Sequence, residues 1–76
     1  MPNLDRITLD PTVMGGKACI RGMRVTVGMI VSLIASGRTM DEVLAAYPYL
    51  QLPDIAQALS YAAWRVEEHE STLQLA

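Results

Sequence analysis

The sequence predicts a mainly α fold, a three-helix helix-turn-helix bundle that follows a short N-terminal β region. Apolar residues recur at helical spacing in three successive segments of residues 27–69, whereas short extended runs broken by glycine and proline fill residues 5–26. At 76 residues the chain has the length of one small domain, 1–76. Residues 70–76 carry no helix signal and are predicted to form a tail.

Three short extended pieces are expected in the β region. The alternation over Ile7–Asp10 predicts a strand that ends before Pro11, which lacks the N–H that a central ladder needs. Ala18–Arg21 and Met23–Thr26 predict two further pieces, hinged at Gly22. A sheet this small leaves open edges, so we expect it to pack on the helices or to pair with a second copy in a strand-mediated dimer.

Two helices are predicted directly after the β region. Val27–Ser36 is apolar on nearly all sides, which predicts a central buried helix. Gly37 suits the left-handed residue that ends such a helix. Thr39 and Glu42 have the spacing of a capping box, and this predicts that a second, short helix begins near Met40.

A third helix is expected after Pro48 and a turn of about five residues. Pro53 suits its first helical position, and the helix is expected to fray near His69. The predicted inward face consists of apolar residues, namely Ile55, Ala58, Leu59, Ala62, Ala63 and Val66. The predicted outward face carries a single basic residue and consists of Asp54, Gln57, Tyr61, Arg65 and Glu68. The third helix is therefore poorly suited to bind DNA, although it occupies the position of the recognition helix in a helix-turn-helix.

The charges are divided unequally along the chain. Residues 1–38 carry five basic and two acidic residues, whereas residues 39–76 carry one basic and six acidic residues. This division suits a basic half that contacts an anionic partner and an acidic half that contacts a basic one, although a solvated surface gives the same pattern. Because 51% of the residues are hydrophobic in so small a domain, we also expect a homodimer or higher oligomer.

The residues for catalysis, metal binding or cofactor binding are few. Cys19 lies in an apolar run with no histidine nearby, which favours a packed, unreactive thiol. His69 stands among glutamates near a helix end, so solvation is its simplest role. We therefore expect no catalytic residues, no metal site and no cofactor. We also predict a cytoplasmic protein, because the sequence has one cysteine and shows neither the pattern of a signal peptide nor that of a membrane-spanning helix.

Two sets of side chains are candidates for binding. Lys17, Arg21 and Arg24 could hold phosphates of DNA at the rim of the small sheet, although charges on edge strands also serve to prevent aggregation. The other set could bind a protein partner and consists of Trp64, Glu67, Glu68 and Glu70. Trp64 could alternatively close the core.

Several segments, taken together, resemble the bacterial DUF433 family over roughly residues 5–66. These segments are Gly15–Val27, Ile34–Gly37, Tyr47–Leu50 and Ala58–Ala63. The resemblance implies a homeodomain-like helix-turn-helix preceded by short strands, and a VapB-like antitoxin paired with a PIN-like nuclease. It further implies that the basic N-terminal half of a dimer binds operator DNA while the acidic C-terminal part contacts the toxin.

The sequence therefore leads to one main hypothesis and two alternatives. The main hypothesis is a non-enzymatic antitoxin of a type II toxin–antitoxin pair that neutralises a PIN-like ribonuclease and binds its own promoter. The first alternative is a stand-alone DNA-binding transcriptional regulator. The second is a homodimeric interaction module with no role at DNA.

Overall fold

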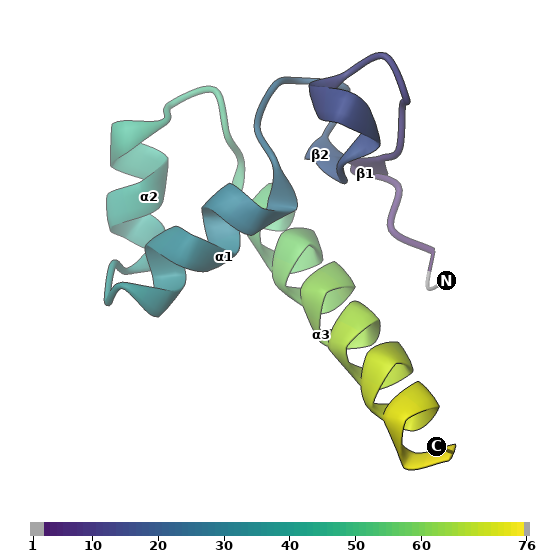
Figure 1. Ribbon diagram of the computed structural model, residues 1–76. Helices are drawn as coiled ribbons and strands as arrows, with labels where there is room; N and C mark the ends of the chain where they lie inside the picture. The colour runs from purple at the N-terminus through teal and green to yellow at the C-terminus, as the bar shows by residue number, and fades with distance from the viewer. Residues whose placement is uncertain (1–2, 76) are drawn as a thin grey trace.

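The computed structural model describes the backbone of residues 3–75 and the side chains of residues 3–69. The chain folds into three α-helices that follow a two-stranded antiparallel sheet, which confirms the predicted fold class (Figure 1). In chain order the elements are β1 (Ile7–Thr8), the 3-10 turn η1 (Met14–Gly16), β2 (Cys19–Ile20), α1 (Val27–Ala35), α2 (Met40–Ala46) and α3 (Leu52–Leu75).

The strands lie where the sequence predicts them but are shorter. Ile7 of β1 pairs with Ile20 of β2, and Thr8 pairs with Cys19. Each strand is two residues long rather than four. The third extended piece contributes a single bridge, between Thr26 and Cys19, before α1 begins.

Caps fix where the first two helices begin and end. The Thr26 hydroxyl accepts a hydrogen bond from the Met29 amide at 3.0 Å and so caps α1, and Gly37 follows α1 with a φ of 99°. The Thr39 hydroxyl accepts from the Glu42 amide at 3.1 Å, while the Glu42 carboxylate accepts from the Thr39 amide at 2.9 Å. The predicted capping box at α2 is therefore confirmed.

The third helix differs from the prediction at both ends. It begins at Leu52, so Pro53 is its second residue rather than its first. It continues to Leu75, so the prediction of a tail is wrong for residues 70–75. The last residue of the predicted tail, Ala76, lies outside the described residues. Neither glycine nor proline occurs after Pro53, and each residue added to an existing helix gains one hydrogen bond without a second nucleation cost.

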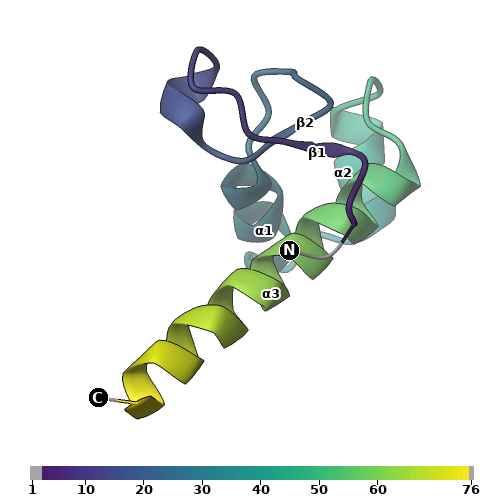
Figure 2. The ribbon, with the colours of Figure 1, turned by 90° about the vertical axis from the view of Figure 1, so that its right-hand side faces the viewer.

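The C-terminal turns of α3 project beyond the rest of the molecule. At about 1.5 Å per residue, a helix of this length spans roughly 36 Å. Figures 1 and 2 show α1 and the β1–β2 sheet against the first part of α3, with no other described element beside its last turns. The domain therefore presents an extended helix end.

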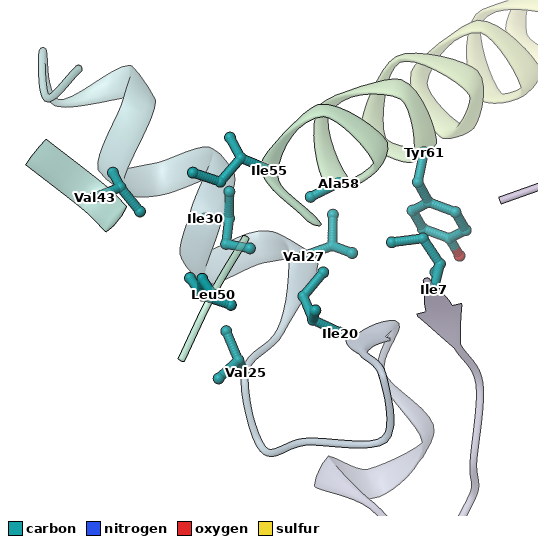
Figure 3. Close-up of a cluster of buried hydrophobic side chains, with 10 residues drawn as sticks. All are labelled: Ile7, Ile20, Val25, Val27, Ile30, Val43, Leu50, Ile55, Ala58 and Tyr61. Atoms are coloured by element: carbon teal, nitrogen blue, oxygen red, sulfur yellow. The ribbon is translucent and has the colours of Figure 1, made fainter. Parts of the chain in front are cut away.

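One hydrophobic core joins the two strands and the three α-helices (Figure 3). Ile20 of β2, Ile30 of α1 and Ile55 of α3 are all fully buried. The remaining members of the core come from β1, from two loops and from all three helices. They are Ile7, Val25, Val27, Val43, Leu50, Ala58 and Tyr61. Cys19 is also buried, as predicted for a packed thiol.

The central helix is less completely covered than predicted. Val27 and Ile30 of α1 are buried, but Val31, Leu33 and Ile34 are half-exposed. A helix that is apolar on nearly all sides normally lies in the interior. The described part of one chain therefore leaves apolar surface of α1 in contact with water.

The inward face of α3 is rotated relative to the prediction. Asp54 and Tyr61, which were expected to face outward, are 0% and 9% exposed. Ala63 and Val66, which were expected to face inward, are exposed. Hydropathy assigns Asp54 to the surface because an isolated carboxylate is costly to bury, and the contacts of this residue explain why the assignment is wrong.

Candidate functional site

The three basic residues predicted to bind DNA lie in different environments. Lys17, directly after η1, is exposed, and so is Arg24 in the turn that follows β2. Arg21 instead reaches the start of α3. Its Nε and Nη2 donate to the two carboxylate oxygens of Asp54 at 3.1 and 3.0 Å, and Nη2 also donates to the Tyr49 carbonyl at 2.9 Å.

Asp54 forms the centre of a charged cluster. The Arg6 Nη1 donates to its Oδ1 at 2.9 Å, and the backbone amide of Gln51 donates to its Oδ2 at 2.8 Å. Two guanidinium groups, those of Arg6 and Arg21, therefore share one buried carboxylate. Among the described residues, each buried side-chain nitrogen and oxygen has a hydrogen-bond partner, so the cost of burying the charge is offset.

Further hydrogen bonds join the segment before β1 to α3. The Arg6 amide donates to the Gln57 Oε1 at 2.9 Å, and the Gln57 Nε2 donates to Asp5 at 2.8 Å. Arg6 Nη1 also donates to the Gln51 Oε1 at 2.7 Å. The N-terminal segment is thus held along the first two turns of α3.

The contacts of Asp54 determine its pKa. Burial is the largest influence and by itself raises the pKa of the carboxyl. The hydrogen bonds from Arg21, Arg6 and the Gln51 amide together outweigh burial, and hold the pKa of Asp54 below its ordinary value of 3.8. Asp54 is therefore ionised at neutral pH, and the cluster is a structural ion network.

The backbone at Arg21 is strained in a way that serves this network. Arg21 and Gly22 have φ values of 46° and 73°, and the Met23 amide donates to the Ile20 carbonyl at 2.8 Å. Positive φ at both central residues is typical of a type I′ turn, which favours glycine or asparagine over arginine. The three hydrogen bonds of the Arg21 guanidinium offset the cost of this conformation.

Sequence reasoning missed the network because its members lie far apart along the chain. Asp54 is 48 residues from Arg6 and 33 residues from Arg21. The local pattern shows an acidic residue in the first turn of a helix, which the helix dipole alone would explain. The interpretation of Arg21 as a DNA contact stays a prediction, but its guanidinium is already engaged by Asp54.

A groove of about 760 Å³ lies between α1 and α3. Its walls come from the residues before β2, from the N-cap and first turns of α1 and from the middle of α3. They are formed by Lys17, Ala18, Thr26, Val27, Gly28, Val31, Ser32, Tyr61, Ala62, Arg65 and Val66. Two of these residues are cationic and none is acidic. Within the described part of the chain, neither Lys17 nor Arg65 forms an ion pair.

The residues predicted to bind a protein partner lie on the last part of α3. Trp64 is half-buried, with its ring centroid 6.0 Å from that of Tyr61 and the two ring planes at 49°. Glu67 and Glu68 are exposed where the helix leaves the domain. The side chain of Glu70 lies outside the described side chains.

Two features are absent from the described part of the chain. No group of three or more His, Cys, Asp or Glu side chains in that part of the chain is arranged to hold a metal ion. None of the described helices is both long and apolar enough to cross a membrane.

Comparison with family models decides where the chain belongs. The family model for DUF433, which is described as a protein of unknown function, matches residues 7–62. This range includes β1, β2, α1, α2 and the packed part of α3. This chain belongs to the DUF433 family. The match confirms the resemblance read from the sequence, and the acidic turns of α3 lie beyond the part that the DUF433 model covers.

Two relatives place this DUF433 chain among known proteins. A crystal structure of a DUF433 member protein from Anabaena variabilis ATCC 29413 is 32% identical, has a TM-score of 0.77, and is matched over 91% of this chain and 68% of that one. An uncharacterised protein, y4eO of Sinorhizobium fredii (strain NBRC 101917 / NGR234), is 34% identical over 56 residues, or 74% of this chain. The present chain spans a quarter of the length of y4eO.

Proposed function

We propose that this DUF433 protein is a non-enzymatic antitoxin that neutralises a PIN-like ribonuclease through the acidic end of α3. The observation that carries the proposal is the projecting helix, which holds Glu67 and Glu68 beyond the domain (Figures 1 and 2). The class of partner comes from the family resemblance, which implies a VapB-like antitoxin.

Electrostatics explains how such a helix would inhibit a nuclease. An enzyme that cleaves RNA with a carboxylate-bound divalent metal has a basic surface along which the RNA binds. Glutamates compete with RNA for that surface and with the carboxylates of the enzyme for the metal. An ordered helix also loses less conformational entropy on binding than a flexible tail. Trp64 lies one turn before the glutamates, and its exposed part adds an apolar anchor.

The test combines capture with a ribonuclease assay. The tagged full chain is captured from its native host, and the RNA cleavage by the co-purifying protein is measured with added wild-type or variant chain. We expect a stoichiometric PIN-like protein that wild type inhibits, and a loss of inhibition of about tenfold in Glu67→Lys.

The matched control is Asp41→Lys, which makes the same charge change at an exposed residue of α2. This variant is expected to inhibit as wild type does. Recovery of the chain without a PIN-like protein contradicts the proposal, as does equal inhibition by Glu67→Lys and wild type.

The arrangement of α2 and α3 favours a second candidate function, binding of operator DNA as part of the antitoxin or as a stand-alone regulator. Residues 47–51 join the two helices, as in a helix-turn-helix. The exposed side chains on the first turns of α3 are uncharged, namely Leu52, Pro53, Ala56 and Ser60. Phosphate contacts would therefore come from Lys17 and Arg24 in the N-terminal region.

Salt dependence tests this candidate. Affinity for a duplex from upstream of the protein's own gene is measured by fluorescence anisotropy over a range of salt concentrations. Each lost phosphate contact reduces the log–log slope by about 0.9, so Lys17→Ala/Arg24→Ala should reduce it by roughly 2 per protomer. Arg38→Ala removes an exposed charge elsewhere and should leave the slope unchanged. Undetectable or salt-independent binding of wild type excludes this candidate.

A further inference from the structure

The groove between α1 and α3 has the chemistry of a docking site for a helix. Val27, Val31 and Ala62 give it apolar walls, and Gly28 and Ala18 leave room for a backbone to approach closely. Helices commonly bind in such grooves through one apolar face. An occupant must therefore supply an apolar stripe.

The charges of the groove restrict the occupant further. Lys17 and Arg65 are its charged residues, both cationic, and the described structure pairs neither with a carboxylate. An occupant that carries acidic residues beside its apolar stripe would pair these cations, whereas a basic one would be repelled.

The last part of α3 has the required composition. Val66 is 55% exposed, and the residues after Arg65 include Glu67, Glu68 and Glu70 but no Lys or Arg. This part of the helix also projects from the domain, so a second molecule can reach it (Figures 1 and 2). One chain thus carries both a basic, apolar groove and an acidic helix.

We propose that the groove is occupied by α3 of a second copy of this chain, in a two-fold symmetric dimer. Because Arg65 and Val66 line the groove and belong to α3 itself, each copy can insert its helix into the groove of the other. The half-exposed apolar residues of α1, including Val31 in the groove wall, gain cover in the same contact.

Symmetry fixes how the helices pair. A two-fold axis that crosses α3 near Val66 makes the two helices antiparallel. The face of α3 that borders the groove carries Ala62, Arg65 and Val66, which are three and four residues apart, so this face of one copy meets the same face of the other. Glu67 follows Arg65 by two residues, or about 200° of helix rotation, so it lies on the opposite face and remains available to another partner.

Sedimentation velocity on the purified full chain tests the dimer, with circular dichroism to verify that each variant is folded. Wild type should be a dimer. Arg65→Glu should raise the dissociation constant by about tenfold or more, because it places a carboxylate in each groove that receives the acidic end of α3 from the other copy.

A variant of Val66 and a matched control variant test the apolar contact. Val66→Asp should be monomeric where wild type is dimeric, whereas Leu52→Asp should dimerise normally, since Leu52 is equally exposed, at 53%, but lies at the other end of α3. A wild-type monomer at all concentrations overturns the proposal. So does a dimer that is insensitive to Val66→Asp and to Arg65→Glu, because it would use another surface, such as the strand edges.

Discussion

Asp54 is a residue on which three parts of the chain converge. Its carboxylate accepts hydrogen bonds from Arg6 before β1, from Arg21 after β2 and from the amide that precedes α3. The guanidinium side chains are 26% and 37% exposed, so water still solvates part of each charge. The carboxylate itself depends on these partners, since it is fully buried.

Removal of this carboxylate should destabilise the domain strongly. Asp54→Ala leaves two guanidinium groups beside an emptied, buried position, and we expect a loss of about 3 kcal/mol in the free energy of unfolding. For a domain of this size that is a large part of the total stability. Urea denaturation measures the loss. Asp41→Ala, at an exposed position of α2, should cost less than about 1 kcal/mol, and an equal loss in both variants would contradict the role of the network.

The carboxylate of Asp54 should also make the free energy of unfolding depend on pH in acidic solution. The pKa of Asp54 is lower in the folded protein than its ordinary value of 3.8, so the unfolded chain binds this proton more readily. Its contribution is complete well above pH 3.8 and is lost as the pH falls below that value through the folded pKa. Urea midpoints of wild type should therefore drop more steeply below about pH 4 than those of Asp54→Asn, and parallel curves would show that Asp54 does not contribute.

At the scale of the elements, local signals predict the ends of helices well. The capping box at Thr39 and Glu42 and the terminating glycine at Gly37 act within a few residues, so the sequence shows them directly. The rotation of α3 could not be predicted in this way. Burial of Asp54 depends on two arginines that precede it by 33 and 48 residues, and hydropathy alone places a carboxylate in water.

The candidate binding residues likewise divide into features that the local sequence predicts and features that depend on tertiary contacts. Lys17, Arg24, Glu67 and Glu68 are exposed, as local composition indicates for charged residues. The engagement of Arg21 with Asp54 and the groove between α1 and α3 depend on tertiary packing, so neither is visible in any short segment.

The cap of α2 offers a test at this scale. Thr39→Ala removes the acceptor for the Glu42 amide and should cost about 1 kcal/mol of unfolding free energy. Thr39→Asn keeps a capping oxygen and should stay within about 0.5 kcal/mol of wild type. Thermal denaturation of both variants measures the difference. Equal destabilisation by alanine and asparagine would show that the hydroxyl acts in some other way.

At the scale of the whole molecule, one core and one charged network join the sheet to the helices, which predicts a single unfolding transition. Trp64, the one tryptophan, reports on the contact with Tyr61, and far-ultraviolet circular dichroism reports on the helices. The two signals should change together in urea. Separate midpoints would show that the packing around Trp64 is lost independently of the helices.

The shared carboxylate also constrains how this protein can change over evolutionary time. Because Asp54 neutralises Arg6 and Arg21 together, the loss of either arginine weakens the ion network, and the loss of Asp54 leaves both cations beside an apolar core. A viable descendant is therefore expected to replace positions 6, 21 and 54 as a set, for example by uncharged residues that fill the same volume. The three positions should consequently covary among relatives although they are far apart in the sequence.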